Sequence, residues 1–170
     1  MLRIFDPVAA ALVIAASSAA AVVDLRTRRV PNALTAGIVA VGLTLAALDL
    51  TRVSLSAAAT GLVVGLFLML PGHLLGGTGA GDVKLLAALG TLLGPAATAA
   101  AFVYTLMAGG VIVMIVAARR GRLRVTVART SALVRTGGGN VAEIERPSSD
   151  NRFAYAPAIA IGACLAALGV

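Results

Sequence analysis

Tryptophan is absent from this chain, and cysteine and histidine are present only once each, as Cys164 and His73. A single cysteine excludes an intramolecular disulfide and a cysteine-based metal cluster. With only one histidine beside it, the set of Cys and His ligands from which zinc sites are normally built is missing. We therefore expect neither a metal nor an organic cofactor.

Charged residues are also scarce. They make up 12% of the 170 residues, whereas 59% are hydrophobic. Soluble domains have roughly 45–50% apolar and about 25% charged residues. This composition indicates a polytopic integral membrane protein, and the length suffices for about six spans of roughly 20 residues. We expect a single all-α, membrane-embedded domain over residues 1–170, folded as a bundle of six transmembrane helices.

The candidate spans are six apolar segments. Their expected bounds are residues 6–25, 32–49, 54–72, 82–93, 96–118 and 153–169, with a long loop over 119–152. The fourth segment is too short to cross a hydrocarbon core of ~30 Å, so we expect it to be tilted, or re-entrant and covered by its neighbours. Abundant Ala and Gly predict closely packed helix backbones. The first apolar core is long, so we expect a retained span, not a cleaved signal.

Basic residues are unevenly placed along the chain. Eight of the fourteen lie between Arg119 and Arg152, three follow the first span, and the net charge is +7. Alternate threading of six spans puts these two groups on one side together with His73 and Lys84. Short basic loops beside spans face the cytoplasm. We expect a multi-pass membrane protein whose basic loops face the cytoplasm, with anionic lipid rather than nucleic acid as their partner.

Acidic residues number only seven, and two of them border apolar segments on the same predicted side: Asp24 and Asp82. An ionised carboxylate near hydrocarbon is costly unless it is paired, hydrated or functional. Two carboxylates that meet can share one proton, so that one acts as a base towards water while the other acts as an acid. The pattern therefore predicts a cytoplasm-facing aspartic protease pair.

Each aspartate also has a purely structural interpretation. Asp24 precedes a run of arginines and Asp82 follows a glycine-rich turn. The first could be an incidental acid in a basic membrane anchor, and the second the N-cap of a helix, with Lys84 as a nearby cation. The glycines before Asp82 would let another segment approach without Cβ obstruction.

With both motifs in place, the chain resembles the type IV prepilin leader peptidases, which are Gly-x-Gly-Asp intramembrane aspartyl proteases. The matching residues are Asp24, Arg26, Arg28, Arg29, Pro31, Asn32 and Thr35; Gly79, Gly81, Asp82, Lys84 and Leu85; and Pro157, Ala158, Ile159, Ala160 and Gly162. The resemblance implies that Asp24 and Asp82 are the catalytic pair. It gives supporting or substrate-loop roles to Gly79, Gly81, Lys84, Arg28, Arg29, Pro31 and Asn32.

The resemblance also implies a reaction. It is removal of a short basic leader from a type IV prepilin or pseudopilin at the cytoplasmic face of a prokaryotic inner membrane, with pilus assembly or secretion machinery as a partner. Larger relatives carry an extra cytoplasmic domain with paired cysteines and methylate the new terminus. This chain has only Cys164 and no such domain, so we expect no methyltransferase activity. The small size favours the Flp-type prepilins of tight-adherence systems.

Other polar residues carry weaker predictions. We expect Asp49 and Arg52 to form a surface pair, His73 to have no catalytic role, and Tyr104 and Tyr155 to be membrane-interface anchors. Ser17 and Ser18 lack a base for nucleophilic catalysis. Two other functions remain open: a small transporter that uses the aspartates as an ion or proton relay, and a non-catalytic assembly factor for a pilus or secretion machine.

Overall fold

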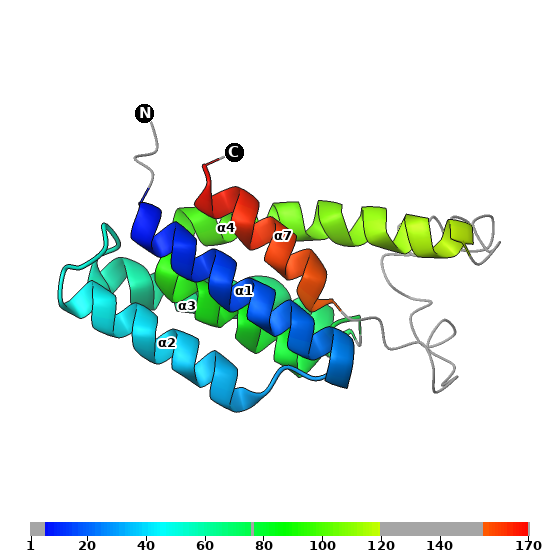
Figure 1. Ribbon diagram of the computed structural model, residues 1–170, viewed down its shortest axis with the longest axis horizontal. Coiled ribbons are helices and arrows are strands. Elements are labelled where there is room, and N and C mark those ends of the chain that lie inside the picture. Colours follow the sequence, from blue (N-terminus) through cyan, green and yellow to red (C-terminus); the bar gives the residue numbers. More distant parts are fainter. Residues whose placement is uncertain (1–5, 76, 120–154, 170) are drawn as a thin grey trace.

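The computed structural model describes residues 6–75, 77–119 and 155–169, and the regular structure in these ranges is entirely helical. The elements are α1 (Pro7–Thr27), α2 (Asn32–Ala47), α3 (Leu55–Leu74), α4 (Ala80–Arg119) and α7 (Ala156–Ala167) (Figure 1). The all-α prediction is confirmed for these residues. Apart from Arg119, the loop predicted over 119–152 lies outside them.

Three of these helices, α1, α3 and the 80–116 part of α4, are long and apolar enough to cross a membrane. Two more, α2 and α7, are apolar but shorter.

The chain reverses direction inside α4, at Gly94. Gly94 has φ 72° and ψ 171°, a conformation that glycine adopts without a Cβ penalty. Pro95 follows it and lacks the N–H that would continue the helical ladder. Gly94 lines a cavity with Ala9 of α1, whereas Gly109 packs against Tyr155 at the other end of the bundle. The two parts of α4 correspond to the segments predicted at 82–93 and 96–118.

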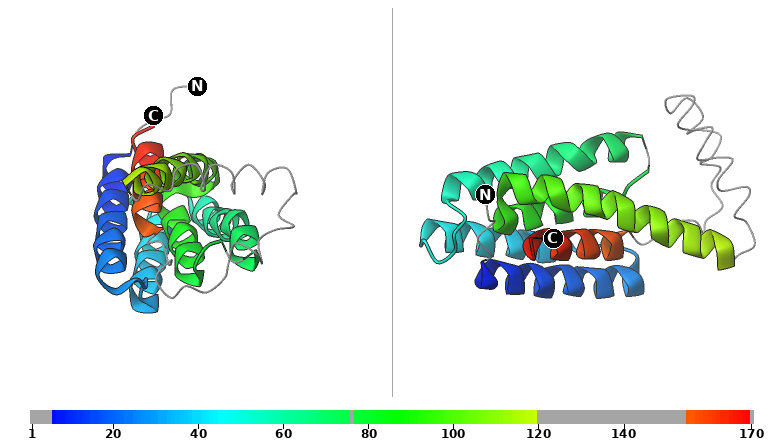
Figure 2. Two further views of the ribbon diagram at one scale, coloured as in Figure 1. Left: turned by 90° about the vertical axis from the view of Figure 1, so that its right-hand side faces the viewer. Right: turned by 90° about the horizontal axis from the view of Figure 1, so that it is seen from above.

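The first part of α4, residues 80–93, is the centre of the bundle. Leu85, Leu86, Ala88 and Leu89 are all fully excluded from solvent, and α4 contacts each of the other helices. A helix that is apolar on every side is stable only when neighbours surround it. The expectation that neighbours cover this short segment is confirmed. Figure 2 shows α7 lying between α1 and the second part of α4.

Helix backbones meet directly where α3 crosses α4. A Cβ added to Gly61 would overlap the carbonyl oxygen of Gly90, and a Cβ on Gly90 would overlap that of Gly61. A Cβ on Gly65 would come within 2.7 Å of the Leu86 carbonyl oxygen. Small residues form such contacts where helices pack in lipid. The predicted close packing is therefore present at this interface.

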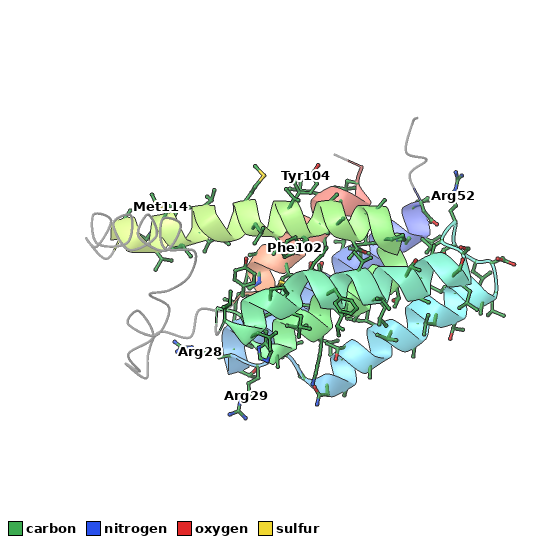
Figure 3. All side chains as sticks on the ribbon, turned by 180° about the vertical axis from the view of Figure 1, so that it is seen from behind. Arg28, Arg29, Arg52, Phe102, Tyr104 and Met114 are labelled. Carbon is green, nitrogen blue, oxygen red and sulfur yellow. The ribbon has the colours of Figure 1, made fainter. Side chains whose placement is uncertain are left out.

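The two ends of the bundle differ. Figure 3 shows Arg28 and Arg29 at one end and Arg52 at the other. At the Arg52 end, Asp6 caps α1 and also accepts the backbone N–H of Arg52 at 2.7 Å. A cavity of about 350 Å³ lies beside this contact. Within the described ranges no ion pair joins Asp49 to Arg52, so that prediction is wrong: the residue that binds the Arg52 segment is Asp6.

Candidate active site

Asp24 lies in the last turn of α1 and is only 5% exposed. Its Oδ2 accepts the backbone N–H of Ala156, the first residue of α7, at 3.2 Å. The helix ends just beyond it, because the Arg28 N–H donates to the Asp24 carbonyl at 2.7 Å and Arg28 adopts a left-handed conformation with φ 52°. The carboxylate is therefore fixed where α1 meets the start of α7.

Asp82 lies in the first turn of α4 and is 7% exposed. The Gly79 carbonyl accepts the N–H groups of Asp82 at 3.0 Å and Val83 at 3.3 Å, so Gly79 occupies the N-cap position. The Asp82 carboxylate reaches back and accepts the Gly79 N–H at 3.0 Å. This is the third-residue half of a capping box. The interpretation of Asp82 as the N-cap itself is wrong, because the helix begins two residues earlier, at Ala80.

The two carboxylates come from different helices and share one end of the bundle. Asp24 is close enough to Asp82 for its charge to act on that carboxyl. Both side chains are buried, and two neighbouring buried carboxylates cannot both ionise easily. The geometry therefore suits a pair that holds one proton between them.

The turn between α1 and α2 lies against the glycine turn that precedes Asp82. A Cβ on Gly81 would come within 3.2 Å of the Val30 Cβ. The Lys84 ammonium donates to the Asn32 side-chain oxygen at 3.1 Å. The close approach expected at these glycines is present at Gly81. Lys84, expected as a cation for Asp82, has its hydrogen bond to Asn32 instead, because it points to the exposed side of α4.

The remaining motif residues form the exposed rim of this turn. Arg28, Arg29 and Pro31 are all exposed, and Figure 3 shows the two arginine side chains at this end of the molecule. The Thr27 hydroxyl bonds the Val23 carbonyl at 2.8 Å and the Arg29 carbonyl at 2.9 Å. This ties the start of the basic turn to the last turn of α1.

Other polar groups are engaged away from the carboxylates. His73 Nδ1 lies 2.9 Å from the Thr78 carbonyl, which fixes the end of α3 against the glycine turn. The Ser17 hydroxyl bonds the Ile14 carbonyl at 3.4 Å and lies 3.6 Å from the Cys164 sulfur, deep between α1 and α7. None of these three contacts gives His73 or Ser17 a role in bond cleavage.

Two features of this end were not predicted from the sequence. Ala156 contributes through its backbone N–H, and alanine gives no side-chain signal for such a role. Tyr155, predicted only as an interface anchor, directly precedes that N–H and is half-buried. Pro157 at the second position of α7 was the available signal for a helix start at this point.

Comparison with known protein families gives a match. A family model described as the type IV leader peptidase family matches residues 11–114. The matched range includes Asp24 and Asp82 and the glycine turn between α3 and α4, and it ends before α7. No curated protein and no solved structure matches the chain.

Proposed function

Because the chain belongs to the type IV leader peptidase family, we propose that it is an aspartic endopeptidase that removes leader peptides from type IV prepilins or pseudopilins, with Asp24 and Asp82 as its catalytic pair. The observation that carries the proposal is that these two buried carboxylates, from separate helices, lie at one end of the bundle within range of each other's charge. Both lie in the part of the chain that matches the family.

The pair can perform hydrolysis without an added cofactor. One carboxylate takes a proton from water as the water oxygen attacks the scissile carbonyl carbon, and the protonated partner donates to the carbonyl oxygen. The tetrahedral intermediate then collapses, the C–N bond breaks, and the leaving amine receives a proton from the pair. Asp24 and Asp82 each accept one backbone N–H, so both carboxyls have fixed orientations.

The substrate must present an extended peptide bond, because the peptide groups of a helix are engaged in its hydrogen-bond ladder. The glycine turn beside Asp82 has no side chains at Gly79 and Gly81 that would obstruct an extended peptide. Gly79 is exposed and Gly81 is half-buried. The basic side chains of Arg28, Arg29 and Lys84 lie at the same end. We assign substrate entry to this end.

The membrane arrangement is part of the proposal. Because the chain reverses at Gly94, α4 consists of two segments, and the five described helices contain six segments in all. This supports six membrane helices. Arg28, Arg29 and Lys84 lie at the end that carries the carboxylates, and Arg52 at the other. By the positive-inside rule the proposed active site faces the cytoplasm. We assign Flp-type prepilins as its substrates and their pilus machinery as its partner.

The test is cleavage of a co-expressed Flp-type prepilin by the wild type and by the variants Asp24→Asn and Asp82→Asn. The exposed Asp49→Asn is the matched control. Membrane levels of each variant are followed by blotting. We expect the wild type and Asp49→Asn to trim the leader, and both site variants to be inactive at normal membrane levels. Cleavage by either site variant would show that the aspartates are structural or ion-conducting.

A further inference from the structure

Tyr155 lies at the start of α7, where that helix meets the proposed catalytic Asp24. It is the N-cap of α7, and its carbonyl accepts the N–H groups of Ala158 at 3.0 Å and Ile159 at 3.2 Å. The next residue, Ala156, donates its N–H to Asp24. The peptide group that joins Tyr155 to Ala156 is therefore fixed at both ends. Its carbonyl binds the first turn of α7, and its N–H binds the Asp24 carboxylate.

The tyrosine ring is fixed as well. It lies across Gly109 in the second part of α4, so that a Cβ on Gly109 would come within 3.0 Å of both the ring Cε2 and the hydroxyl oxygen of Tyr155. The neighbouring Gly110 has nothing within 4 Å of such a Cβ. Gly109 thus provides the space into which the ring fits.

The hydroxyl of Tyr155 has no hydrogen-bond partner in the ranges that the structure describes, although the residue is half-buried. Burial raises the pKa of Tyr155, and the negative charge of Asp82 raises it further. The hydroxyl is therefore within electrostatic range of Asp82 and stays protonated, as a hydrogen-bond donor, at neutral pH.

We propose that Tyr155 is a third catalytic residue, whose hydroxyl donates a hydrogen bond to the carbonyl oxygen of the scissile peptide. The inference rests on the proposed peptidase function. Negative charge develops on that oxygen as water attacks, and a fixed donor aimed at it lowers the barrier. The proton stays on the tyrosine throughout, so the proton transfers between water, the pair and the leaving amine are unchanged.

The first experiment compares Tyr155→Phe with the wild type in cleavage of a prepilin peptide by the purified full chain in detergent. Loss of one such donor lowers kcat by roughly 10²-fold in other enzymes. We expect a loss of this order with KM little changed. Tyr104→Phe, which removes the other tyrosine hydroxyl of the chain, is the control and should retain wild-type kcat. A wild-type kcat for Tyr155→Phe would overturn the proposal.

A second variant moves the hydroxyl without removing it. Gly109→Ala displaces the ring, whereas Gly110→Ala fills open space. We expect Gly109→Ala to lower kcat and Gly110→Ala to leave it unchanged. In the Tyr155→Phe background Gly109→Ala should have little further effect, because both changes act on one contact. Additive losses, or a fall in kcat that simply follows a fall in thermal stability, would assign Tyr155 a structural role and overturn the inference.

The same assay separates this inference from the function on which it rests. If the wild type cleaves, Asp24→Asn does not, and Tyr155→Phe keeps full kcat, only the role of Tyr155 is overturned. If Asp24→Asn cleaves as well as the wild type, the aspartic mechanism fails and the role of Tyr155 fails with it.

Discussion

The backbone N–H of Ala156 donates to the carboxylate of Asp24 at 3.2 Å, across 132 positions of sequence. The first N–H groups of a helix have no partner within the helix, and this one is buried at the point where α7 begins. Asp24 therefore stabilises the junction of α1 with α7 in addition to its proposed part in catalysis. The two roles can be separated by the choice of substitution.

Asp24→Asn should abolish activity while leaving the fold intact. The amide oxygen of asparagine can still accept the Ala156 N–H, whereas the acid is gone; we expect a loss of roughly 10²–10⁴-fold in kcat, as for a general acid or base. Asp24→Leu should be inactive and also less stable by about 1–3 kcal/mol, because it leaves the buried N–H without a partner. Thermal unfolding in detergent, measured beside cleavage, distinguishes the two. Equal stability of the two variants would contradict this account of Asp24.

Gly81→Ala should lower turnover by displacing the turn between α1 and α2. The added Cβ would stand 3.2 Å from the Val30 Cβ, a tight contact that requires the turn to move. Small displacements at a reacting centre can cost up to about 10²-fold, and we expect a loss of roughly 10-fold or more in kcat. Gly77→Ala is the control, since its Cβ would meet the nearest atom, the Gly72 oxygen, at an ordinary 3.4 Å. Full turnover by Gly81→Ala would show that this contact does not position the site.

Much of this arrangement could be predicted from the sequence because it follows from local rules. Apolar length predicted approximately where helices would begin and end, including the separate segments 82–93 and 96–118, and the uneven basic residues placed Asp24 and Asp82 at one end. In the structure the charge of Asp24 acts on Asp82, so the two carboxylates lie at the same end of the bundle. The positions of the basic residues along the chain were sufficient for this prediction. Alternate threading of the spans puts the end of the first span and the start of the fourth on the same side.

Contacts set by side-chain direction were not predictable in the same way. The direction of Lys84 towards Asn32 depends on the rotation of α4 about its axis, which a segment that is apolar almost all round does not reveal. Asp82 is the third residue of its helix because the helix begins at Ala80, two residues before the predicted start of this segment. Ala156 contributes through its backbone N–H, so its residue type gives no signal for this contact.

Gly61→Ala should be strongly destabilising, although the change adds only a methyl group. That methyl group would overlap the Gly90 carbonyl oxygen, where the backbones of α3 and α4 meet. Overpacking of this kind costs typically 1–3 kcal/mol. Gly37→Ala is the matched substitution in α2, where nothing lies within 4 Å of the new Cβ. It should be neutral or stabilising by up to about 1 kcal/mol. Thermal unfolding of both variants in one detergent tests the difference, and equal melting temperatures would refute it.

Asp6 should make the stability of the molecule depend on acid pH. Burial acts to raise the pKa of Asp6, but the N–H groups of Arg52, Ala9 and Val8 and the charge of Arg52 together lower it below its usual 3.8. A carboxyl whose pKa is lower in the folded state binds its proton less readily there than in the unfolded chain. Its stabilisation is therefore complete above pH 3.8 and is lost as the pH falls through the lower, folded value.

Asp6→Asn isolates this effect, because asparagine caps a helix about as well as aspartate but carries no charge. At neutral pH we expect the variant to be less stable than the wild type by about 0.3–1 kcal/mol, the usual contribution of an anion at a helix N-terminus. The difference should shrink as the pH falls below 3.8, since the wild-type carboxyl then becomes protonated. Thermal unfolding of the two proteins in detergent from neutral to acid pH measures it, with the exposed Asp49→Asn as control. A difference that persists unchanged into strong acid would mean that shape, not charge, makes Asp6 the better cap.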